Sequence, residues 1–511
     1  MKYYKLLLVS IFIIAAFTRF YNLSILPPGL HPDEAANGLD IIRMIDNNDF
    51  RTLYNTNGPR EALFFYLQGI FVLLFGFTSF ALRIAPALIG VLTILGLYLL
   101  VKEWLDKNYG LLASFFLAIS SWHIQFSRNG FRAIMVPLIL VFLLYFLTKT
   151  VREKKLIYFI LSGVFFSLGF YTYLAYLMIL PMGLFFIIYL WFTKKMEFKN
   201  FLENNWKKIL IAILAAFIIY LPLLMYYVKN PSDFLARSTG VSILNSDSSS
   251  PIVLLTKNAI KALSMFNIKG DINFRHNYAS LPMLDPFLGA FFIMGALITL
   301  FRLKKTEYFF LFIWFGFMLA PTILSAEGIP HALRAVGTIP IAYIFSIIGI
   351  KAFYESFVKY DRKKMALVFL TLVIIAGTTF NLTKYFAWWA NDPVTFAAYD
   401  YDISNMAEFM KNLPKNVEKY AIIFGYSNHS LAFLTHDNKD RSIKGLYGIS
   451  GDYYVIDQIY KIEAINPKSN RYVFAIQKDM FDDAKYELPR FFPDGKFFKR
   501  DGFFYYTNIN L

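Results

Sequence analysis

Hydrophobic residues along the chain fall in blocks separated by short polar stretches, and most blocks are about 15–22 residues long, enough for a helix to cross the roughly 30 Å core of a bilayer. In lipid, such a block satisfies its backbone hydrogen bonds only as a helix. The pattern therefore predicts a mostly α-helical, polytopic transmembrane bundle. Eleven spans are expected, at residues 5–22, 81–101, 109–122, 133–149, 156–173, 175–193, 208–228, 284–301, 308–325, 332–350 and 364–382.

A further apolar block at residues 62–76 is short and follows a charged stretch. Lysines and arginines cluster in alternate connections, after residues 101, 149, 193, 301 and 350. Basic loops stay in the cytoplasm, so these connections and the N-terminus are expected there. If residues 62–76 crossed the membrane, every later basic loop would lie outside. We therefore expect this block to form an interfacial or buried helix, and residues 5–22 to be a retained first span rather than a signal peptide.

This orientation places three long segments on the outer face. Two are the loops 23–80 and 229–283 of a transmembrane domain that covers residues 1–382. The third is residues 383–511, where strand-like runs alternate with turn residues and a helical stretch near 403–412. The sequence predicts a small extracytoplasmic α/β domain there, on a multi-pass protein of the plasma membrane. The strand-like runs are 420–424, 453–456, 471–476 and 503–507.

Composition agrees with this class. Of the 511 residues, 57% are hydrophobic and only 17% are charged, whereas a soluble domain carries about 25% charged residues. The net charge of +16 would suit a nucleic-acid-binding protein. Because the basic residues lie between apolar blocks, orientation of the spans explains them better, and no nucleic-acid partner is expected. The chain has no cysteine, which excludes disulfide and thiolate chemistry.

Two adjacent carboxylates, Asp33 and Glu34, follow His31 and Pro32 just beyond the first span. A carboxylate near the lipid boundary can act as a general base, because partial desolvation raises its pKa. The same residues also fit a helix N-terminus, with a proline and two acidic residues in the first turn. Both interpretations remain open and are compatible with each other.

Arg60 and Glu61 precede the apolar block at 62–76, and both are candidates for binding the acceptor or the sugar. Glu61 could bind a metal ion, orient the acceptor, or complement the dipole of a helix that begins there. Together with His31, Asp33 and Glu34 it could bind a divalent cation, although no fixed ligand spacing establishes such a site. Glu61 and His31 are the candidate metal ligands.

Three arginines lie near the outer ends of predicted spans. Arg128 and Arg132 are four residues apart, which would place them on one face of a helix, and Arg334 is at the outer start of the tenth span. The planar fork of arginine suits phosphate binding. Snorkelling of the side chain to the interface is the alternative explanation.

Weaker candidates lie nearby. Tyr171 and Tyr173 could bind sugar or belong to an interfacial aromatic belt, and His331 could meet the substrate or be structural. The second long loop and the residues after it add further polar side chains: Arg237, Asp271, Arg275, His276 and Asp285. The first four could meet a substrate, and Arg275 and His276, near the return to the membrane, are the best candidates among them.

Three segments, LHPDEAANGLDI, GPREALFFYLQGIFVLLFGFTSFALRIAPALIG and SSWHIQFSRNGFRA, resemble membrane glycosyltransferases of the GT-C fold. The resemblance is to glycosyltransferase family 39, the group that contains protein O-mannosyltransferases, aminoarabinose transferases and RgtA/B/C/D-like proteins. It covers roughly residues 1–350, is strongest over 1–140, and does not cover the tail. Its most specific parts are the Pro-Asp-Glu after the first span and the run at 75–90.

Such enzymes transfer a sugar from a polyprenyl-phosphate carrier to a lipid, glycan or protein acceptor of the cell envelope. The resemblance implies an inverting hexosyl- or pentosyltransferase in which Asp33 is the catalytic base and Glu34 its neighbour in the motif. Arg128 or Arg132, with Arg334, would hold the donor phosphate. Glu61 falls where aminoarabinose transferases have a metal-ligating glutamate, but the Lys-Pro found near it in those enzymes is missing here.

Two alternatives remain. A transporter or flippase of lipid-linked sugars is disfavoured, because the spans contain few charges and the chain shows no internal repeat. Transfer of a whole oligosaccharide is disfavoured because the Trp-Trp-Asp motif of oligosaccharyltransferases is absent; the chain has Trp388, Trp389 and Ala390 instead.

Overall fold

The computed structural model describes residues 2–234, 251–326, 328–436, 443–444, 450–451, 453–467 and 469–511. The described chain is mostly helical and divides into two compact units. The second unit combines the C-terminal segment with most of the first predicted outer loop. The predicted domain boundary after residue 382 instead assigns this loop to the transmembrane domain. Arg237 lies outside the described residues. The first unit is Met1–Tyr21, Gly58–Phe64 and Pro86–Trp389; the second is Asn22–Asn57, Phe65–Ala85 and Ala390–Leu511.

Eight helices of the described chain are long and apolar enough to cross a membrane, in agreement with a polytopic membrane protein. They coincide with eight of the eleven predicted spans. The helical segments are Tyr3–Phe20, Ser79–Trp104, Arg132–Glu153, Leu174–Thr193, Lys195–Lys229, Thr306–Ile323, Val336–Lys359 and Lys363–Trp389.

The other three predicted spans form shorter helices, α5 (Lys107–Ile119), α8 (Leu156–Leu168) and α13 (Pro286–Phe301). The block at 109–122 is divided because Ser120 starts a new helix, α6 (Ser121–Arg128), where its hydroxyl accepts a hydrogen bond from the His123 amide at 3.1 Å. A serine that caps a helix in this way ends the preceding one. The block at 62–76 forms α3 (Leu63–Phe75), whose 13 residues are fewer than a span requires.

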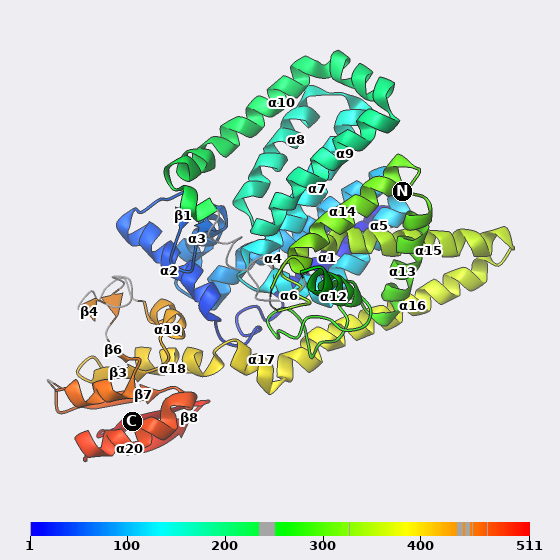
Figure 1. Cartoon of the computed structure of the whole chain (residues 1–511). Helices are drawn as coiled ribbons and strands as arrows, with labels where there is room; N and C mark the ends of the chain where they lie inside the picture. Colours follow the sequence, from blue (N-terminus) through cyan, green and yellow to red (C-terminus); the bar gives the residue numbers. More distant parts are fainter. Residues whose placement is uncertain are drawn as a thin grey trace. The chain divides into compact units, whose positions relative to one another are not determined.

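Close backbone contacts join the helices of the first unit. In Figure 1, α8 lies beside α7 and α10. A Cβ atom on Gly163 of α8 would lie 2.2 Å from the Ala212 carbonyl oxygen of α10. Similarly, Gly349 of α15 meets the Phe291 carbonyl of α13, where a Cβ would lie 2.1 Å away. Small residues allow helix backbones to pack closely in lipid, where no hydrophobic force drives association.

The remaining elements of the first unit connect these helices. Its helices are α1 (Lys2–Phe20), α7 (Met135–Glu153), α9 (Ile179–Thr193), α10 (Lys195–Lys229), α12 (Pro251–Ser264), α14 (Thr306–Ile323), α15 (Ile339–Lys359) and α16 (Lys363–Thr383), and its short elements are β2 (Arg60–Glu61), η1 (Arg132–Ile134), η2 (Gly169–Tyr171), η3 (Leu174–Met178), η5 (Val336–Thr338) and the π-helix η6 (Lys384–Trp389). α4 (Ser79–Trp104) and α3 contain residues of both units.

The second unit contains a five-stranded mixed sheet of order β6-β3-β7-β9-β8. β3 pairs in parallel with β6 and β7, whereas β9 pairs antiparallel with β7 and β8. The strands are β3 (Glu418–Ile422), β6 (Tyr454–Ile456), β7 (Tyr472–Ile476), β8 (Lys496–Arg500) and β9 (Phe503–Thr507), with the short strands β1 (Leu53–Tyr54), β4 (Ile443–Lys444) and β5 (Ser450–Gly451) elsewhere.

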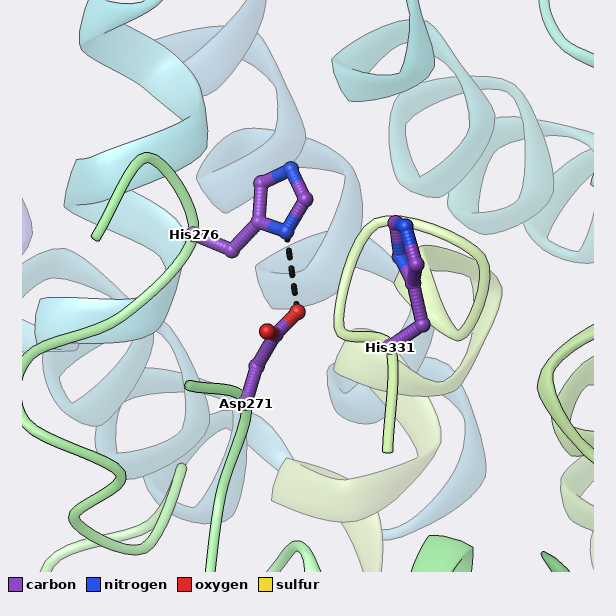
Figure 2. Close-up of side chains that lie close together, drawn as sticks. All are labelled: Asp271, His276 and His331. Carbon is purple, nitrogen blue, oxygen red and sulfur yellow. Dashed lines mark hydrogen bonds and ion pairs between the residues drawn. The ribbon is translucent and has the colours of Figure 1, made fainter. Parts of the chain in front are cut away.

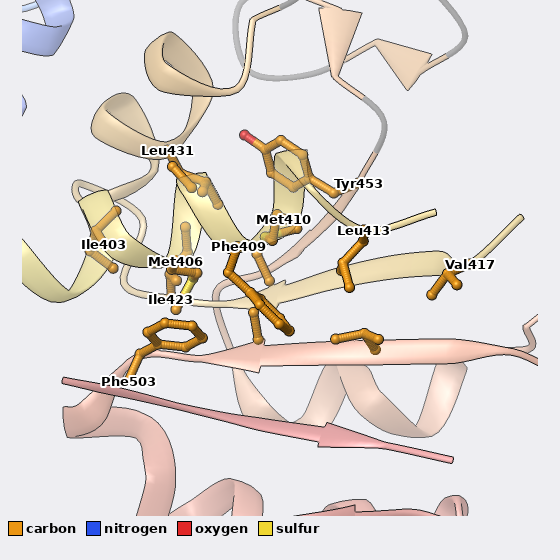
Figure 3. Packing of buried hydrophobic residues seen from close by; sticks show 14 residues of the cluster. Ile403, Met406, Phe409, Met410, Leu413, Val417, Ile423, Leu431, Tyr453 and Phe503 are labelled. Carbon is orange, nitrogen blue, oxygen red and sulfur yellow. The ribbon is translucent and has the colours of Figure 1, made fainter. Parts of the chain in front are cut away.

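Helices cover both faces of this sheet. Met406, Phe409 and Met410 of α18 (Tyr401–Lys411) pack on one face, and Figure 3 shows them between the helix and the strands. Ala484 and Leu488 of α20 (Phe481–Phe491) pack on the other. The predicted small C-terminal α/β domain is therefore confirmed. The other helices of this unit are α2 (Pro32–Asn47), α17 (Pro393–Ala398), α19 (Asn428–Leu434), η8 (Ile459–Ala464) and η9 (Lys478–Met480).

Candidate active site

Asp33 lies in the first turn of α2, in the second unit. His31 is the N-cap residue, and its Nδ1 accepts a hydrogen bond from the Asp33 amide at 3.0 Å. The helix start predicted from Pro32, Asp33 and Glu34 is therefore present. The Asp33 side chain keeps 35% of its surface exposed, so a substrate hydroxyl could reach its carboxylate.

Two side chains donate hydrogen bonds to Oδ1 of Asp33. Asn57 Nδ2 does so at 2.6 Å, and the hydroxyl of Tyr426 from the C-terminal segment contacts the same oxygen. Sequence reasoning did not single out either residue. Asn57 stands beside the Gly-Pro that precedes Arg60, but no pattern in the chain connects Tyr426 with residue 33.

Glu34 is completely buried in an ion pair with Arg83 of α4. Arg83 Nη2 lies 2.9 Å from Oε2, and Nε lies 3.2 Å from Oε1. The same guanidinium donates to the carbonyl oxygens of Pro27 and Gly29 at 2.8 and 2.7 Å. These contacts fix the loop before α2, which favours a structural role; a catalytic contribution of Glu34 stays a prediction.

Replacing Glu34 by alanine is expected to destabilise the protein by about 3–5 kcal/mol, because it leaves the Arg83 charge buried without its carboxylate. The effect is measured by heating the protein in detergent and recording the temperature at which monodisperse protein is lost. Glu487→Ala is the matched control, since its side chain is 36% exposed and its partner Arg490 is 71% exposed. Equal unfolding temperatures for the two variants would show that the ion pair does not stabilise the fold.

In the first unit, Glu61 and Arg132 form an ion pair with side chains only 14% and 7% exposed. The Arg132 guanidinium carbon lies 5.7 Å from the centre of the Tyr173 ring. Arg334 makes a hydrogen-bond contact with the same tyrosine and also donates to Ser325 Oγ. The structure therefore brings together four predicted site residues: Glu61, Arg132, Tyr173 and Arg334.

This group borders a cleft in the first unit, with about 380 Å³ of space between atoms, part of which is open solvent. Glu61 and Tyr173 belong to its wall, and the other lining residues are aromatic or aliphatic. A polar end with an apolar wall is the general character of a site for an amphipathic ligand. The apolar lining is Phe170, Leu174, Tyr176, Leu177, Tyr220, Leu223, Tyr227 and Phe234.

Arg128 and Tyr171 make contacts typical of structural residues. Arg128 is fully buried and donates to the carbonyl oxygens of Thr18, Arg19 and Tyr21 at 3.1, 3.0 and 2.7 Å. It thereby satisfies carbonyl groups at the end of α1, which a helix leaves without partners.

The Tyr171 hydroxyl donates to the Ile219 carbonyl of α10 at 2.7 Å. Arg60 is 4% exposed in β2. The substrate roles predicted for these three residues stay predictions.

A second polar group in the first unit contains Asp271, His276 and His331 (Figure 2), and one ligand atom from each lies within 4.8 Å of the others. His276 Nδ1 lies 2.9 Å from Asp271 Oδ2, which also accepts from the Ala332 amide at 2.8 Å. Nδ1 of His331 is buried and has no hydrogen-bond partner in the described chain. Burial, the charge of His276 and that of Arg334 lower the pKa of His331 to about 3.

Two imidazoles and a carboxylate are the ligand types that Zn²⁺ and similar divalent cations prefer. A neutral imidazole with a buried, unpartnered nitrogen is ready to bind such an ion. The chemistry of this group therefore fits a metal. The two ligands predicted from sequence lie outside it, since Glu61 pairs with Arg132 and His31 caps α2. In the sequence, Asp271 and His276 are five residues apart, which is the only local sign of this group, because His331 is far away in the chain.

Comparison with known proteins gives one family match. Residues 60–226 match the family described as dolichyl-phosphate-mannose-protein mannosyltransferase. No curated protein sequence matches the chain significantly.

Among solved structures, ArnT from Cupriavidus metallidurans bound to undecaprenyl phosphate matches with a TM-score of 0.62, at 12% identity over 98% of both chains. The oligosaccharyltransferase of Archaeoglobus fulgidus in the apo form matches with a TM-score of 0.55, at 15% identity over 99% of this chain and 74% of that one. AglB from Archaeoglobus fulgidus, in complex with an inhibitory peptide and a dolichol-phosphate, gives a TM-score of 0.54 at 15% identity over the same shares.

At such low identity these matches establish the fold, and the family match covers the cleft residues from Glu61 to Leu223. The resemblance seen in the sequence is thereby confirmed: this integral membrane protein has the GT-C fold of membrane glycosyltransferases, and its residues 60–226 match the protein mannosyltransferase family.

Proposed function

We propose that the protein is a membrane glycosyltransferase that moves one sugar from a polyprenyl-phosphate carrier to a hydroxyl group of an acceptor on the outer membrane face. The main observation behind the proposal is that Arg132 and Arg334 both contact Tyr173, which lines the cleft in the first unit. Two guanidinium groups can bind a phosphate, and the apolar wall can take the first isoprene units. A carrier that enters from the bilayer need not pass through water.

In the proposed reaction, the acceptor oxygen forms a bond to the anomeric carbon of the sugar while the bond from that carbon to the phosphate oxygen breaks. The acceptor proton passes to the Asp33 carboxylate. The electron pair of the broken bond stays on the phosphate, which leaves as polyprenyl phosphate. Arg132 and Arg334 stabilise the negative charge that develops on it. Attack opposite the leaving group inverts the anomeric configuration.

Glu61 has two consistent roles in this scheme. Its carboxylate holds the Arg132 guanidinium in place through their ion pair. It is also the carboxylate in the wall of the cleft, where it can accept hydrogen bonds from sugar hydroxyl groups. We propose that the N-terminus is cytoplasmic and that the second unit faces outward, as the basic connections predict.

Asp271, His276 and His331 are proposed to hold one divalent cation. A bound cation would add positive charge near Arg334, which favours departure of a phosphate leaving group. The purified protein is expected to retain close to one equivalent of Zn²⁺ after dialysis against metal-free buffer, measured by elemental analysis.

His331→Gln is expected to lower the affinity for Zn²⁺ by at least about tenfold. His436→Gln is the matched control, because His436 pairs with Asp46 in the second unit. If the wild type retains no more metal than a heat-denatured sample, these three residues form only a hydrogen-bonded group.

The proposal is tested with purified protein in proteoliposomes that contain a panel of radiolabelled polyprenyl-phosphate sugars and cell-envelope extracts as acceptors. Label is expected to leave the carrier and appear in an acceptor fraction with one donor of the panel. Tyr173→Phe should slow transfer by about tenfold, because it removes a hydrogen-bond contact with a charged group. Tyr171→Phe is the matched control for loss of a hydroxyl group, since this hydroxyl donates to the Ile219 backbone carbonyl and not to an arginine. No transfer from any donor by folded protein would contradict the proposal.

A further inference from the structure

Tyr426 connects the C-terminal segment to Asp33 within the second unit. It lies in the turn between β3 and α19, and its hydroxyl donates a hydrogen bond to Oδ1 of Asp33, 393 residues away in the chain. Asn57 Nδ2 donates to the same oxygen at 2.6 Å and lies 3.2 Å from the Tyr426 hydroxyl. Three distant segments therefore meet at one carboxylate oxygen.

Buried contacts fix the position of this turn relative to α2. Helix α19, which follows Tyr426, packs directly on α2. Ser430 Oγ of α19 donates to the Leu30 carbonyl at 2.8 Å. The ring of Phe433 fills the space over Gly38, where a Cβ atom would lie only 2.3 Å from it. Since Ser430 and Phe433 are completely buried, the packing does not need the Tyr426 hydroxyl.

Tyr426 itself is 48% exposed, and the Asp33 side chain is 35% exposed. A water-accessible contact between a phenol and a carboxylate adds little to stability, because water competes for both groups. The same accessibility is required of a base that must meet the hydroxyl group of an incoming acceptor. Location and exposure therefore favour a role in the reaction over a role in packing.

We propose that Tyr426 is a positioning residue for Asp33, so that the C-terminal segment completes the acceptor side of the active site. This inference rests on the proposed function, in which Asp33 removes the acceptor proton. Hydrogen bonds donated to Oδ1 by Tyr426 and Asn57 restrict rotation of the carboxylate and stabilise its ionised form. The base is then charged and oriented before the acceptor binds, which is the arrangement that a fixed catalytic group requires.

Tyr426→Phe tests this inference, because it removes one hydroxyl group and keeps the ring. The turnover number is expected to fall by about tenfold, as for loss of a hydrogen bond to a charged group, while the KM for the lipid donor stays unchanged. The acidic limb of the pH–rate profile should move to higher pH, because a carboxylate that loses a donor binds its proton more tightly. His31, with Nδ1 3.6 Å from Asp33 Oδ2, also contacts this carboxylate and remains in the variant.

Two further variants make the result decisive. Asn57→Ala removes the hydrogen bond that Asn57 donates to Oδ1 and is expected to shift the acidic limb in the same direction. Tyr486→Phe is the matched control, because Tyr486 is 74% exposed on α20 and should leave both turnover and pH profile unchanged. Equal unfolding temperatures of Tyr426→Phe and wild type exclude a folding effect.

The outcomes separate this inference from the proposed function. If wild type transfers sugar and Tyr426→Phe keeps both its turnover number and its pH profile, Tyr426 does not position Asp33 and the inference is wrong. If wild type transfers sugar from no lipid donor, the proposed function itself fails. A lower turnover number with an unshifted acidic limb would also overturn the inference, because it would indicate a role that does not act through the Asp33 carboxylate.

Discussion

Replacing Asp33 by asparagine is expected to reduce sugar transfer by at least about 100-fold, because removal of a general base costs 10²–10⁴ in rate. Asparagine keeps the size of the side chain, and the N-cap of α2 is His31, which the substitution leaves in place, so α2 should form normally. The amide cannot take the acceptor proton. The turnover number with saturating donor and acceptor measures the loss, and the KM for the donor should change little.

Asp49→Asn is the matched control for this experiment. Asp49 lies shortly after α2 and pairs with Arg51, whose side chain is 53% exposed. Its replacement should leave transfer close to wild type, since exposed ion pairs contribute little. If Asp33→Asn retained full activity, Asp33 would serve only as part of the helix start, and the base would have to be another residue.

Replacing Arg132 by glutamine is expected to reduce transfer by about 10²–10³-fold, the usual loss when one group that stabilises developing negative charge is removed. Arg132 is buried, and its guanidinium contacts both Glu61 and the Tyr173 ring. Glutamine can donate hydrogen bonds but carries no charge. Arg132→Lys should be intermediate, because lysine keeps the charge without the planar fork.

The single substitution leaves the largely buried Glu61 without its cation, so a loss of activity could come from a loss of folding. The double variant Arg132→Gln/Glu61→Gln removes both charges and should recover the unfolding temperature but not the activity. Arg302→Gln, on an exposed arginine at the end of α13, is the control for loss of one positive charge. Recovery of transfer in the double variant would contradict a role of Arg132 in phosphate stabilisation.

Continuous apolar blocks predicted most helices, because a lipid-facing helix must be apolar along its whole length. The prediction was less accurate at Ser120, where an apolar block contains a helix cap and divides into α5 and α6. It also missed β8, since this edge strand carries Lys496, Lys499 and Arg500 and lacks apolar alternation. Charged residues on an edge strand prevent it from pairing with strands of other molecules. The same charges interrupt the apolar pattern by which a strand is recognised in the sequence.

The candidate site was only partly accessible to sequence reasoning. Local chemistry indicated Asp33, Glu61, Arg132 and Arg334, because a charged group near the membrane boundary is costly to desolvate and is therefore often functional. Local chemistry could not distinguish Arg132 from Arg128, since only the folded chain shows that Arg128 binds the carbonyl groups of α1. The groupings of Asp271 with His331 and of Asp33 with Tyr426 depend on long-range contacts, which no local spacing encodes.

The most direct measurement of the central claim is the ratio of polyprenyl phosphate released to sugar transferred. A donor labelled with ³H in the lipid and ¹⁴C in the sugar, in proteoliposomes with wild-type protein, gives both quantities from one reaction. The proposed glycosyltransferase predicts one polyprenyl phosphate released for each sugar that appears in the acceptor, and at least about 100-fold less of both products with Asp33→Asn. Movement of the intact, doubly labelled lipid to the opposite leaflet, with no release of polyprenyl phosphate, would contradict the proposal and identify a transporter of lipid-linked sugars.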